Sequence, residues 1–296
     1  MSELSDDALI AELKSRFDTT KQALEEVKII TKKLEEMNRK LRASEQIKST
    51  FISLVKNEIN NPLTSILGLS EQLRLGEHPQ ETVVSIADMI HQESFTLDFQ
   101  LRNIFITAEL ESGEADIQIS SVDVTALIND VIDSFSHLLK EKLIKHRVET
   151  PGRIIFNTDS SHLNIIVANL LANAIKFNLD GGDIIVKASV ANDTLNLSVE
   201  DSGIGIDKTR VGRLFDRFYQ SDAGIMKRHK GHGLGLAIIK ALIESMEGTI
   251  NAETLKSGGS IFSISLPQKQ IDAETASFEV EGGVLLFDDD ETVEEF

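Results

Sequence analysis

Asn169-Leu-Leu-Ala-Asn-Ala-Ile-Lys176 is the stretch of sequence that best indicates the fold. Asn169, Asn173 and Lys176 follow one another in steps of four and three, so they share one face of a helix predicted over 159–177. A carboxamide oxygen can coordinate magnesium, and an ammonium can meet phosphate oxygens. This face is therefore a candidate nucleotide-binding surface, although a solvated polar stripe is the alternative interpretation of this stretch alone.

A second stretch, Asp201-Ser-Gly-Ile-Gly205, follows alternating apolar residues that are typical of a strand. The carboxylate of Asp201 can accept a hydrogen bond from the exocyclic amine of adenine. Gly203 and Gly205 carry no side chain, so the backbone can approach the base closely. The same residue types are also common in ordinary turns. Only the combination with the other stretches makes this one specific.

The third stretch, Gly231-His-Gly-Leu-Gly-Leu236, comes directly before a helix predicted over 233–247. Backbone amides that no side chain obstructs can face phosphate groups at a helix N-terminus. Glycine spacing alone is weak evidence, but here it completes an ordered set. The candidate binding residues of this stretch are Gly231, Gly233, Gly235 and Leu236.

Between the second and third stretches lie Phe215-Asp-Arg217-Phe-Tyr219 and the basic cluster Lys227-Arg-His-Lys230. We count Phe215 and Arg217 among the candidate nucleotide-binding residues. A basic cluster beside a glycine loop fits a mobile cationic flap over a triphosphate, particularly in an otherwise acidic protein. An ordinary basic surface loop is the alternative interpretation.

Residues 1–61 contain neither Pro nor Gly, and their apolar positions recur in alternating steps of four and three. Such a heptad seam predicts a coiled coil over 1–48. The alternative is a single amphipathic helix on a globular body. Coiled coils need a partner helix, so we expect dimerisation. The positions of the seam are Leu13, Phe17, Thr20, Leu24, Val27, Thr31, Leu34, Asn38 and Leu41.

A second helical region is predicted over 49–113, in two runs separated by Gly76 and Pro79. The second run ends at Ser112-Gly113. Two antiparallel helices result, and a dimer of such hairpins forms a four-helix bundle. We therefore predict dimerisation through residues 1–113.

The pattern changes after Gly113 to short alternating apolar runs, mixed with a further helical stretch at 123–142. This mixture predicts an α+β fold over 114–270, an α/β sandwich with helices on one face of a sheet. Residues 271–296 are acidic. They are either a charged tail or, because Gly283-Val-Leu-Leu-Phe-Asp-Asp-Asp-Glu291 resembles an opening strand, the start of a truncated receiver domain.

The composition excludes several classes of function. A formal net charge of −18 disfavours non-specific attraction to nucleic acid or to an anionic membrane. The sequence has no Cys, so disulfides and thiolate metal sites are absent. No apolar run approaches the roughly 20 residues that cross a bilayer, so we expect no direct membrane insertion. The N-terminus lacks the features of a signal peptide, which predicts a cytoplasmic protein.

Taken together, the motifs resemble those of the bacterial sensor histidine kinases of two-component signalling. The resemblance covers nearly all of 44–267. Asn169–Phe177 is similar to the family's N box, Asp201–Gly205 to its first glycine box, Phe215–Tyr219 to its F box and Gly231–Leu236 to its second glycine box. The resemblance implies a gyrase and histidine kinase type of ATPase domain and a phosphotransferase that binds ATP and magnesium.

The same resemblance implies roles for individual residues. Asn173 would be a magnesium ligand, Asn169 and Lys176 would contact phosphates, and Asp201 would hold adenine. Residues 206–230 would form the ATP lid. The family also implies a homodimer that works with the receiver domain of a response regulator.

The sequence departs from the family at the centre of the mechanism. Lys56-Asn57-Glu58-Ile-Asn-Asn61-Pro-Leu63 has asparagine at position 57, where the family has its phosphoacceptor histidine. The lone pair of an amide nitrogen is delocalised, so Asn57 cannot displace ADP from ATP at a useful rate. Self-phosphorylation is therefore not expected. Glu58 and Asn61, one turn apart, match the positions with which the family orients water against an aspartyl phosphate, unless they are merely polar residues before Pro62.

Three explanations of Asn57 stay open. The chain is a pseudokinase that signals by conformation or with a partner kinase, a phosphatase for a response regulator, or a kinase whose histidine was replaced. A different class is an ATP-driven dimeric clamp of the gyrase and chaperone superfamily, or a scaffold with a vestigial ATP domain. The clamp enzymes activate water with a carboxylate in the N-box helix, where this chain has Asn169.

Overall fold

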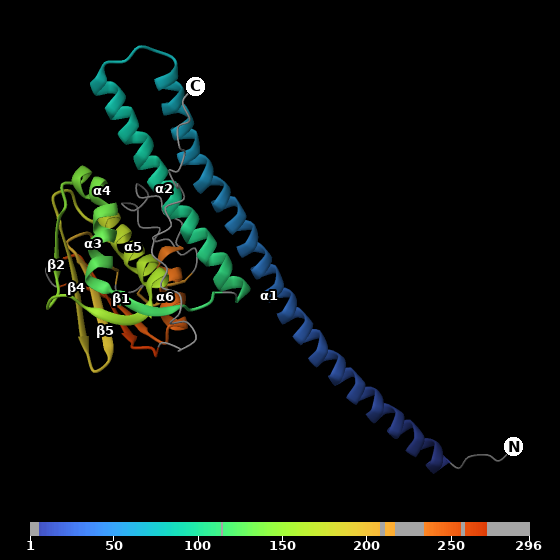
Figure 1. Cartoon of the computed structure of the whole chain (residues 1–296). Coiled ribbons are helices and arrows are strands. Elements are labelled where there is room, and N and C mark those ends of the chain that lie inside the picture. The colour runs from blue at the N-terminus through green and yellow to red at the C-terminus, as the bar shows by residue number, and fades with distance from the viewer. Residues whose placement is uncertain (1–5, 114, 208–210, 217–233, 256–257, 271–296) are drawn as a thin grey trace, which may run out of the picture. The chain divides into compact units, whose positions relative to one another are not determined.

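The computed structural model describes residues 6–113, 115–207, 211–216, 234–255 and 258–270 (Figure 1). Among the candidate residues, Arg217, Gly231 and Gly233 lie outside this range, as do the basic cluster 227–230 and the acidic residues 271–296. The chain divides into two units, Met1–Leu97 and Asp98–Phe296. We consider each unit by itself.

Two helices dominate the N-terminal part. Helix α1 spans Asp6–Arg74 and helix α2 spans Gln80–Ser112, and Pro79 comes directly before α2. Helix α1 continues through the expected boundary between residues 48 and 49, and that domain boundary stays a prediction. Pro62 lies inside α1, one turn after Glu58, whose carbonyl therefore receives no hydrogen bond from position 62. None of the described helices is apolar over a length sufficient to span a bilayer.

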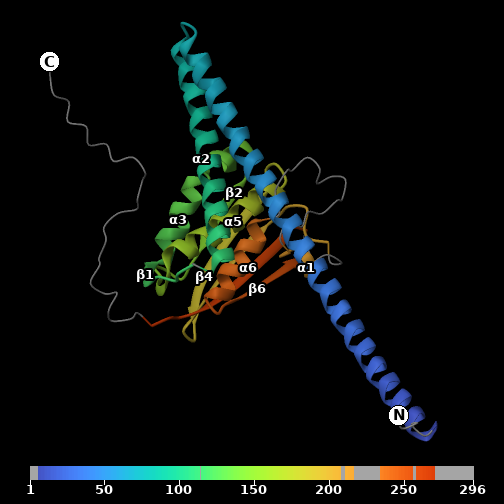
Figure 2. The ribbon, with the colours of Figure 1, turned by 90° about the vertical axis from the view of Figure 1, so that its right-hand side faces the viewer.

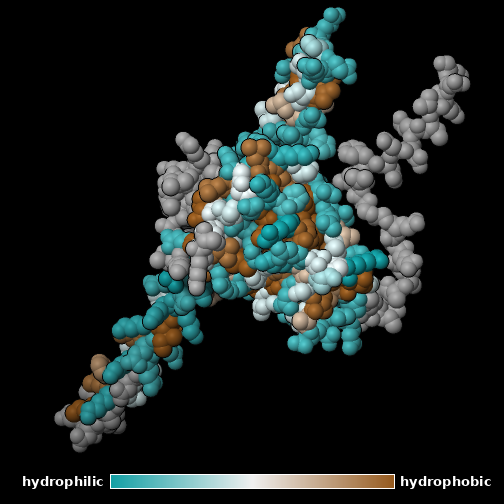
Figure 3. Space-filling view, turned by 90° about the vertical axis from the view of Figure 1, so that its left-hand side faces the viewer, coloured by the Kyte–Doolittle hydropathy of each residue, from teal (hydrophilic) through white to brown (hydrophobic). Residues whose placement is uncertain are grey.

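An apolar seam lies exposed along the N-terminal part of α1. Figure 3 shows apolar side chains interrupting the polar surface of this helix. Burying such a seam against a second helix is what stabilises a coiled coil, so the exposure fits the predicted pairing, which stays a prediction. The members of the seam with side chains more than half exposed are Leu13, Phe17, Leu24, Val27, Leu34 and Leu41.

The second unit contains a five-stranded sheet and a separate two-stranded sheet. The larger sheet has the order β2-β4-β5-β7-β6, in which β2 runs parallel to β4 and the other pairs are antiparallel. Its strands are β2 (Lys145–Glu149), β4 (Asp183–Ala191), β5 (Thr194–Asp201), β7 (Ser260–Pro267) and β6 (Thr249–Thr254). The smaller sheet pairs β1 (Ile119–Asp123) with β3 (Ile155–Asp159).

Helices cover one face of the larger sheet (Figure 2). Leu195, Leu197 and Val199 of β5 are buried toward that face, whereas the residues between them are partly exposed. This period of two is what a sheet with one covered face requires. The predicted α+β sandwich is thereby confirmed. The helices are α3 (Val124–Ser134), α4 (Ser136–Glu141), α5 (Ser160–Phe177) and α6 (Gly235–Ser245), with a short 3₁₀ turn, η1, at Val211–Arg213.

Two predicted helices differ in detail from the structure. The helix expected over 123–142 is interrupted at Phe135, which separates α3 from α4. The buried Phe135 ring lies edge-on to Phe99, with ring centroids 5.6 Å apart. The helix expected over 233–247 begins at Gly235 and ends at Ser245. The described part of the chain therefore places Gly235 within the first turn of α6.

Candidate functional site

Helix α5 begins at a well-defined cap that sets the position of the first motif. The Asp159 carboxylate accepts a hydrogen bond from the backbone N–H of His162 at 2.8 Å and another from that of Gln118 at 2.7 Å. The cap satisfies a backbone donor of the first turn and fixes the residue at which the helix begins. Asn169 is buried, while Asn173 and Lys176 are partly exposed on the same face.

The carboxamide of Asn169 is held by two hydrogen bonds. Its Nδ2 donates to the carbonyl oxygen of Ile165 at 2.9 Å and to Oδ1 of Asn103 at 2.7 Å. Its Oδ1 lies 2.8 Å from the position that a Cβ on Gly235 would occupy. Nδ2 of Asn173 lies 3.8 Å from the same point. The fold thus brings the first sequence motif against the glycine that opens α6, and a larger residue at 235 would collide with Asn169.

Asp201 is a buried carboxylate at the end of β5, with 5% of its surface exposed. Its Oδ1 accepts hydrogen bonds from the backbone N–H groups of Gly203 at 2.8 Å and Ser260 at 3.3 Å, and the Ser260 hydroxyl donates to Oδ2. Burial raises the pKa of the Asp201 carboxyl above its ordinary range, although these hydrogen bonds favour the charged form. The Asp201 carboxylate can therefore accept a hydrogen bond from an amine in a place that is shielded from water.

The second motif lies directly against the end of α5. A Cβ on Gly203 would stand 2.2 Å from the carbonyl oxygen of Phe177, and the backbone N–H of Ile204 donates to that oxygen at 3.2 Å. Only glycine allows this approach. Gly205 has a φ of +71°, in the left-handed region. The second motif and the described end of the third therefore both lie against α5, with Asp201 near its C-terminal end and Gly235 beside its middle.

A buried amide that the sequence analysis missed connects the first two motifs. Asn178, which follows α5, donates through Nδ2 to the carbonyl oxygen of Asp183 at 3.0 Å. Its Oδ1 accepts from the Ser202 hydroxyl at 3.1 Å, and that hydroxyl accepts from the backbone N–H of Asp183 at 2.8 Å. The network ties the Asp201 loop to the end of α5. A polar residue directly after a strongly apolar helix is the sequence signal that could have indicated it.

Lys142 is a second residue that the sequence analysis missed. Its Nζ donates to the carbonyl oxygens of Ile175 at 2.8 Å and Lys176 at 2.9 Å. A cation that binds the last carbonyls of a helix stabilises that end of the helix dipole. Lys142 thereby holds the backbone from which the Lys176 side chain extends. Nothing in the local sequence around Lys142 indicates this contact, which joins residues more than thirty positions apart.

The remaining candidate residues are distributed over both units. Phe215 follows the η1 turn and is partly buried, and Leu236 is partly buried in the first turn of α6. Asn57, Glu58 and Asn61 belong to the first unit, on α1, where Asn57 and Asn61 are exposed and Glu58 is partly buried.

Gly259 is expected to be the most sensitive glycine beside Asp201. It has a φ of +84°, and a Cβ there would stand 1.9 Å from the carbonyl oxygen of Asp201. Gly259→Ala should therefore reduce the free energy of unfolding by at least about 4 kcal/mol. Gly258→Ala is the matched control, because its φ of +91° is equally strained but nothing lies within 4 Å. That variant should lose only about 1–2 kcal/mol. Urea denaturation giving equal losses for both would contradict the close backbone contact.

Comparison with known proteins identifies a family over the second unit. Residues 158–270 match the family described as histidine kinase-, DNA gyrase B-, and HSP90-like ATPase. The chain is 30% identical over 230 residues to sensor protein RprX of Bacteroides fragilis, covering 75% of this chain and 44% of that protein. It is 30% identical over 236 residues to sensor histidine kinase RcsC of Escherichia coli K12, covering 79% and 25%.

A solved structure has a similar fold. Full-length ShkA, crystallised in complex with AMPPNP, superimposes with a TM-score of 0.54 at 23% identity, covering 74% of this chain and 46% of that one. This likeness concerns the fold alone. The chain spans less than half the length of the two curated relatives named above.

Proposed function

Because the chain carries an ATPase domain of the histidine kinase, DNA gyrase B and HSP90 family and is homologous to sensor histidine kinases, we propose that it is a two-component signalling protein that binds ATP with magnesium. One observation supports this proposal above the others. The buried carboxylate of Asp201 and Gly235 both lie against α5, and this supports a nucleotide site along that helix.

The residues of the site have complementary roles. The buried Asp201 accepts a hydrogen bond from the adenine amine, and the nearby Gly203 lets the Asp201 loop lie directly against the end of α5. The ammonium of Lys176 lies 5.2 Å from the centroid of the Phe177 ring, and as a cation it would contact phosphate oxygens. Asn173 offers its carboxamide oxygen to magnesium, an ion that neutralises charge on the phosphates when bound.

The arrangement fits a magnesium ion that arrives with the nucleotide. Among the described residues, no group of three His, Cys, Asp or Glu side chains could hold a metal. Magnesium keeps several waters and commonly binds substrate phosphates with only one or two protein ligands, so it needs no such group. The carboxamide face of α5, with Asn169 turned toward Gly235, provides oxygen ligands of the required kind.

Asn57 determines what the bound ATP does. The Asn57 amide cannot act as a nucleophile, so we expect the protein to bind ATP without phosphorylating itself at this position. Glu58 and Asn61 can still orient a water molecule against an aspartyl phosphate on the receiver domain of a response regulator. We therefore propose phosphatase activity as the second candidate function. The exposed seam of α1 supports a homodimer as the working form.

Calorimetric titration with ATP and magnesium tests the nucleotide proposal. We expect a dissociation constant between about 1 μM and 1 mM, or roughly −8 to −4 kcal/mol. GTP should bind much more weakly, because guanine presents a carbonyl oxygen where adenine presents its amine, and two acceptors would face each other at Asp201. A folded protein that gives no heat with ATP would falsify the proposal.

The rate of ATP hydrolysis separates this function from that of a clamp ATPase. Asn169 stands where the clamp enzymes have a carboxylate, and both of its amide hydrogens are already donated, to Ile165 and Asn103. A carboxamide cannot take a proton from water, so hydrolysis should be slower than about 1 s⁻¹. A coupled assay for ADP measures it. Steady turnover above that rate would favour the clamp.

A further inference from the structure

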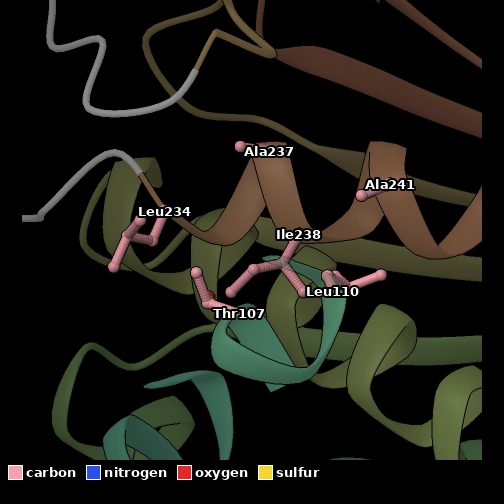
Figure 4. A pocket seen from close by; sticks show the side chains of 6 residues that line it. All are labelled: Thr107, Leu110, Leu234, Ala237, Ile238 and Ala241. Carbon is pink, nitrogen blue, oxygen red and sulfur yellow. The ribbon is translucent and has the colours of Figure 1, made fainter. Parts of the chain in front are cut away.

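The C-terminal segment of α2, Asp98–Ser112, belongs to the same unit as the ATPase fold and packs against it. Ile106 and Thr107 of this segment are each only 4% exposed. Figure 4 shows Thr107 and Leu110 facing side chains of α6 across a small cavity. The residues that α6 and its N-cap contribute to this cavity are Leu234, Ala237, Ile238 and Ala241.

Asn103 lies in this segment, one turn before Thr107, and reaches the candidate site directly. Its Oδ1 accepts the hydrogen bond from Nδ2 of Asn169 at 2.7 Å, across 66 positions of sequence. The backbone carbonyl of Ile165 can only accept a hydrogen bond, so the Asn169 atom that faces it must be the donor Nδ2. The second hydrogen of the same group then needs an acceptor, and Asn103 is the residue that provides one.

This pairing determines which atom Asn169 presents to a nucleotide. With both hydrogens donated, Asn169 has no donor left for a phosphate oxygen. Its Oδ1 faces the Gly235 side, at 2.8 Å from the position of a Cβ there. An amide oxygen repels phosphate but is a good ligand for a hard cation. Asn169 in this orientation therefore fits magnesium and not, as the family resemblance implies, a phosphate group.

We propose that Asn103 is a positioning residue that orients the Asn169 carboxamide so that its oxygen faces the metal of a bound magnesium nucleotide. The proposal rests on the nucleotide function proposed above. A partner that holds the far side of a metal ligand fixes its orientation and raises the affinity of the site for the metal. Since Asn103 is carried by α2, this affinity depends on the C-terminal segment of α2 remaining packed on α6.

The test compares nucleotide binding with and without magnesium. Asn103→Leu keeps the branched shape of the side chain but removes the acceptor. Its dissociation constant for ATP with magnesium should rise about 10- to 100-fold, whereas that for ATP in EDTA should change less than about twofold. Asn103→Asp keeps an acceptor oxygen and should retain the preference for the magnesium complex. If the leucine variant does not fold, Asn103→Ala also removes the acceptor and can be measured in its place.

Ile106→Ala is the matched control, because it loosens the same packed surface without touching Asn169. It should lower the melting temperature while leaving the ratio of the two dissociation constants unchanged. The proposal is overturned if Asn103→Leu keeps the wild-type ratio, weakens both dissociation constants equally, or behaves like Ile106→Ala. If the wild-type protein binds no ATP under either condition, the nucleotide function itself is refuted.

Discussion

Asp201→Asn is expected to weaken ATP binding by about 30- to 100-fold. The carboxylate offers two acceptor oxygens and is surrounded by donors: the N–H groups of Gly203 and Ser260 and the Ser260 hydroxyl. A carboxamide replaces one oxygen with an NH₂ group, which must then face either these donors or the donating amine of adenine. Losing a hydrogen bond to a buried charged group costs about 2–3 kcal/mol, which corresponds to that loss of affinity.

Calorimetry on the folded variant measures the effect, and Glu200→Gln supplies the control. Glu200 precedes Asp201 in β5 but points to the other face, where it accepts a hydrogen bond from Lys187 at 2.6 Å. Neutralising it changes the charge of the same strand without altering the site, so its ATP affinity should remain that of the wild type. Unchanged affinity in Asp201→Asn would show that Asp201 does not contact the base.

The pH dependence of binding provides a second signature of Asp201. Burial raises the pKa of this carboxyl above its ordinary value of 3.8. Only the ionised form accepts hydrogen bonds through both oxygens, so the affinity for ATP should fall as the pH decreases toward this raised pKa. The effect on stability has the opposite sign. The folded state holds the proton more tightly, so the contribution of Asp201 to stability decreases as pH rises from 3.8 through the raised pKa.

The central strands and the motif helix could be predicted from the sequence because their local patterns are strong. Strands β4, β5 and β7 lie inside the sheet and have apolar residues at every second position along most of their length. The edge strands β2 and β6 read Lys-His-Arg-Val-Glu and Thr-Ile-Asn-Ala-Glu-Thr. An edge strand tolerates and often requires charged residues, so its pattern resembles that of a loop. Neither edge strand was predicted.

Only those residues of the candidate site that belong to sequence motifs could be predicted. Asn169, Asp201 and Gly235 were identified because each belongs to a compact pattern of residues. The residues that hold them, Asn103 and Ser260, contact them across 66 and 59 positions. Such contacts depend on tertiary packing, and a single asparagine on a helix or a serine at the start of a strand carries no local signal. Predicting them requires the fold first.

Asn57→His is expected to produce the largest change of all, from no detectable self-phosphorylation to a labelled protein. An imidazole nitrogen has a localised lone pair, and the adjacent Glu58 can orient the ring. Removing a nucleophile typically costs several orders of magnitude in rate, so restoring one should raise the incorporation of γ-phosphate at least about 10³-fold. Incubation with radiolabelled ATP and magnesium measures it. The label should resist base and be released by acid, as a phosphohistidine requires.

Two further variants determine what a positive result means. Asn57→His combined with Asp201→Asn should lose most of the label at low ATP, because the phosphoryl donor no longer binds. Asn57→Ala should remain unlabelled, since it introduces no nucleophile. If Asn57→His acquires no label although it binds ATP as tightly as the wild type, the helical hairpin cannot deliver position 57 to the nucleotide. In that case ATP acts as a ligand that changes the conformation of the protein. The result would then favour a phosphatase or a partner of another kinase over a kinase whose histidine was replaced.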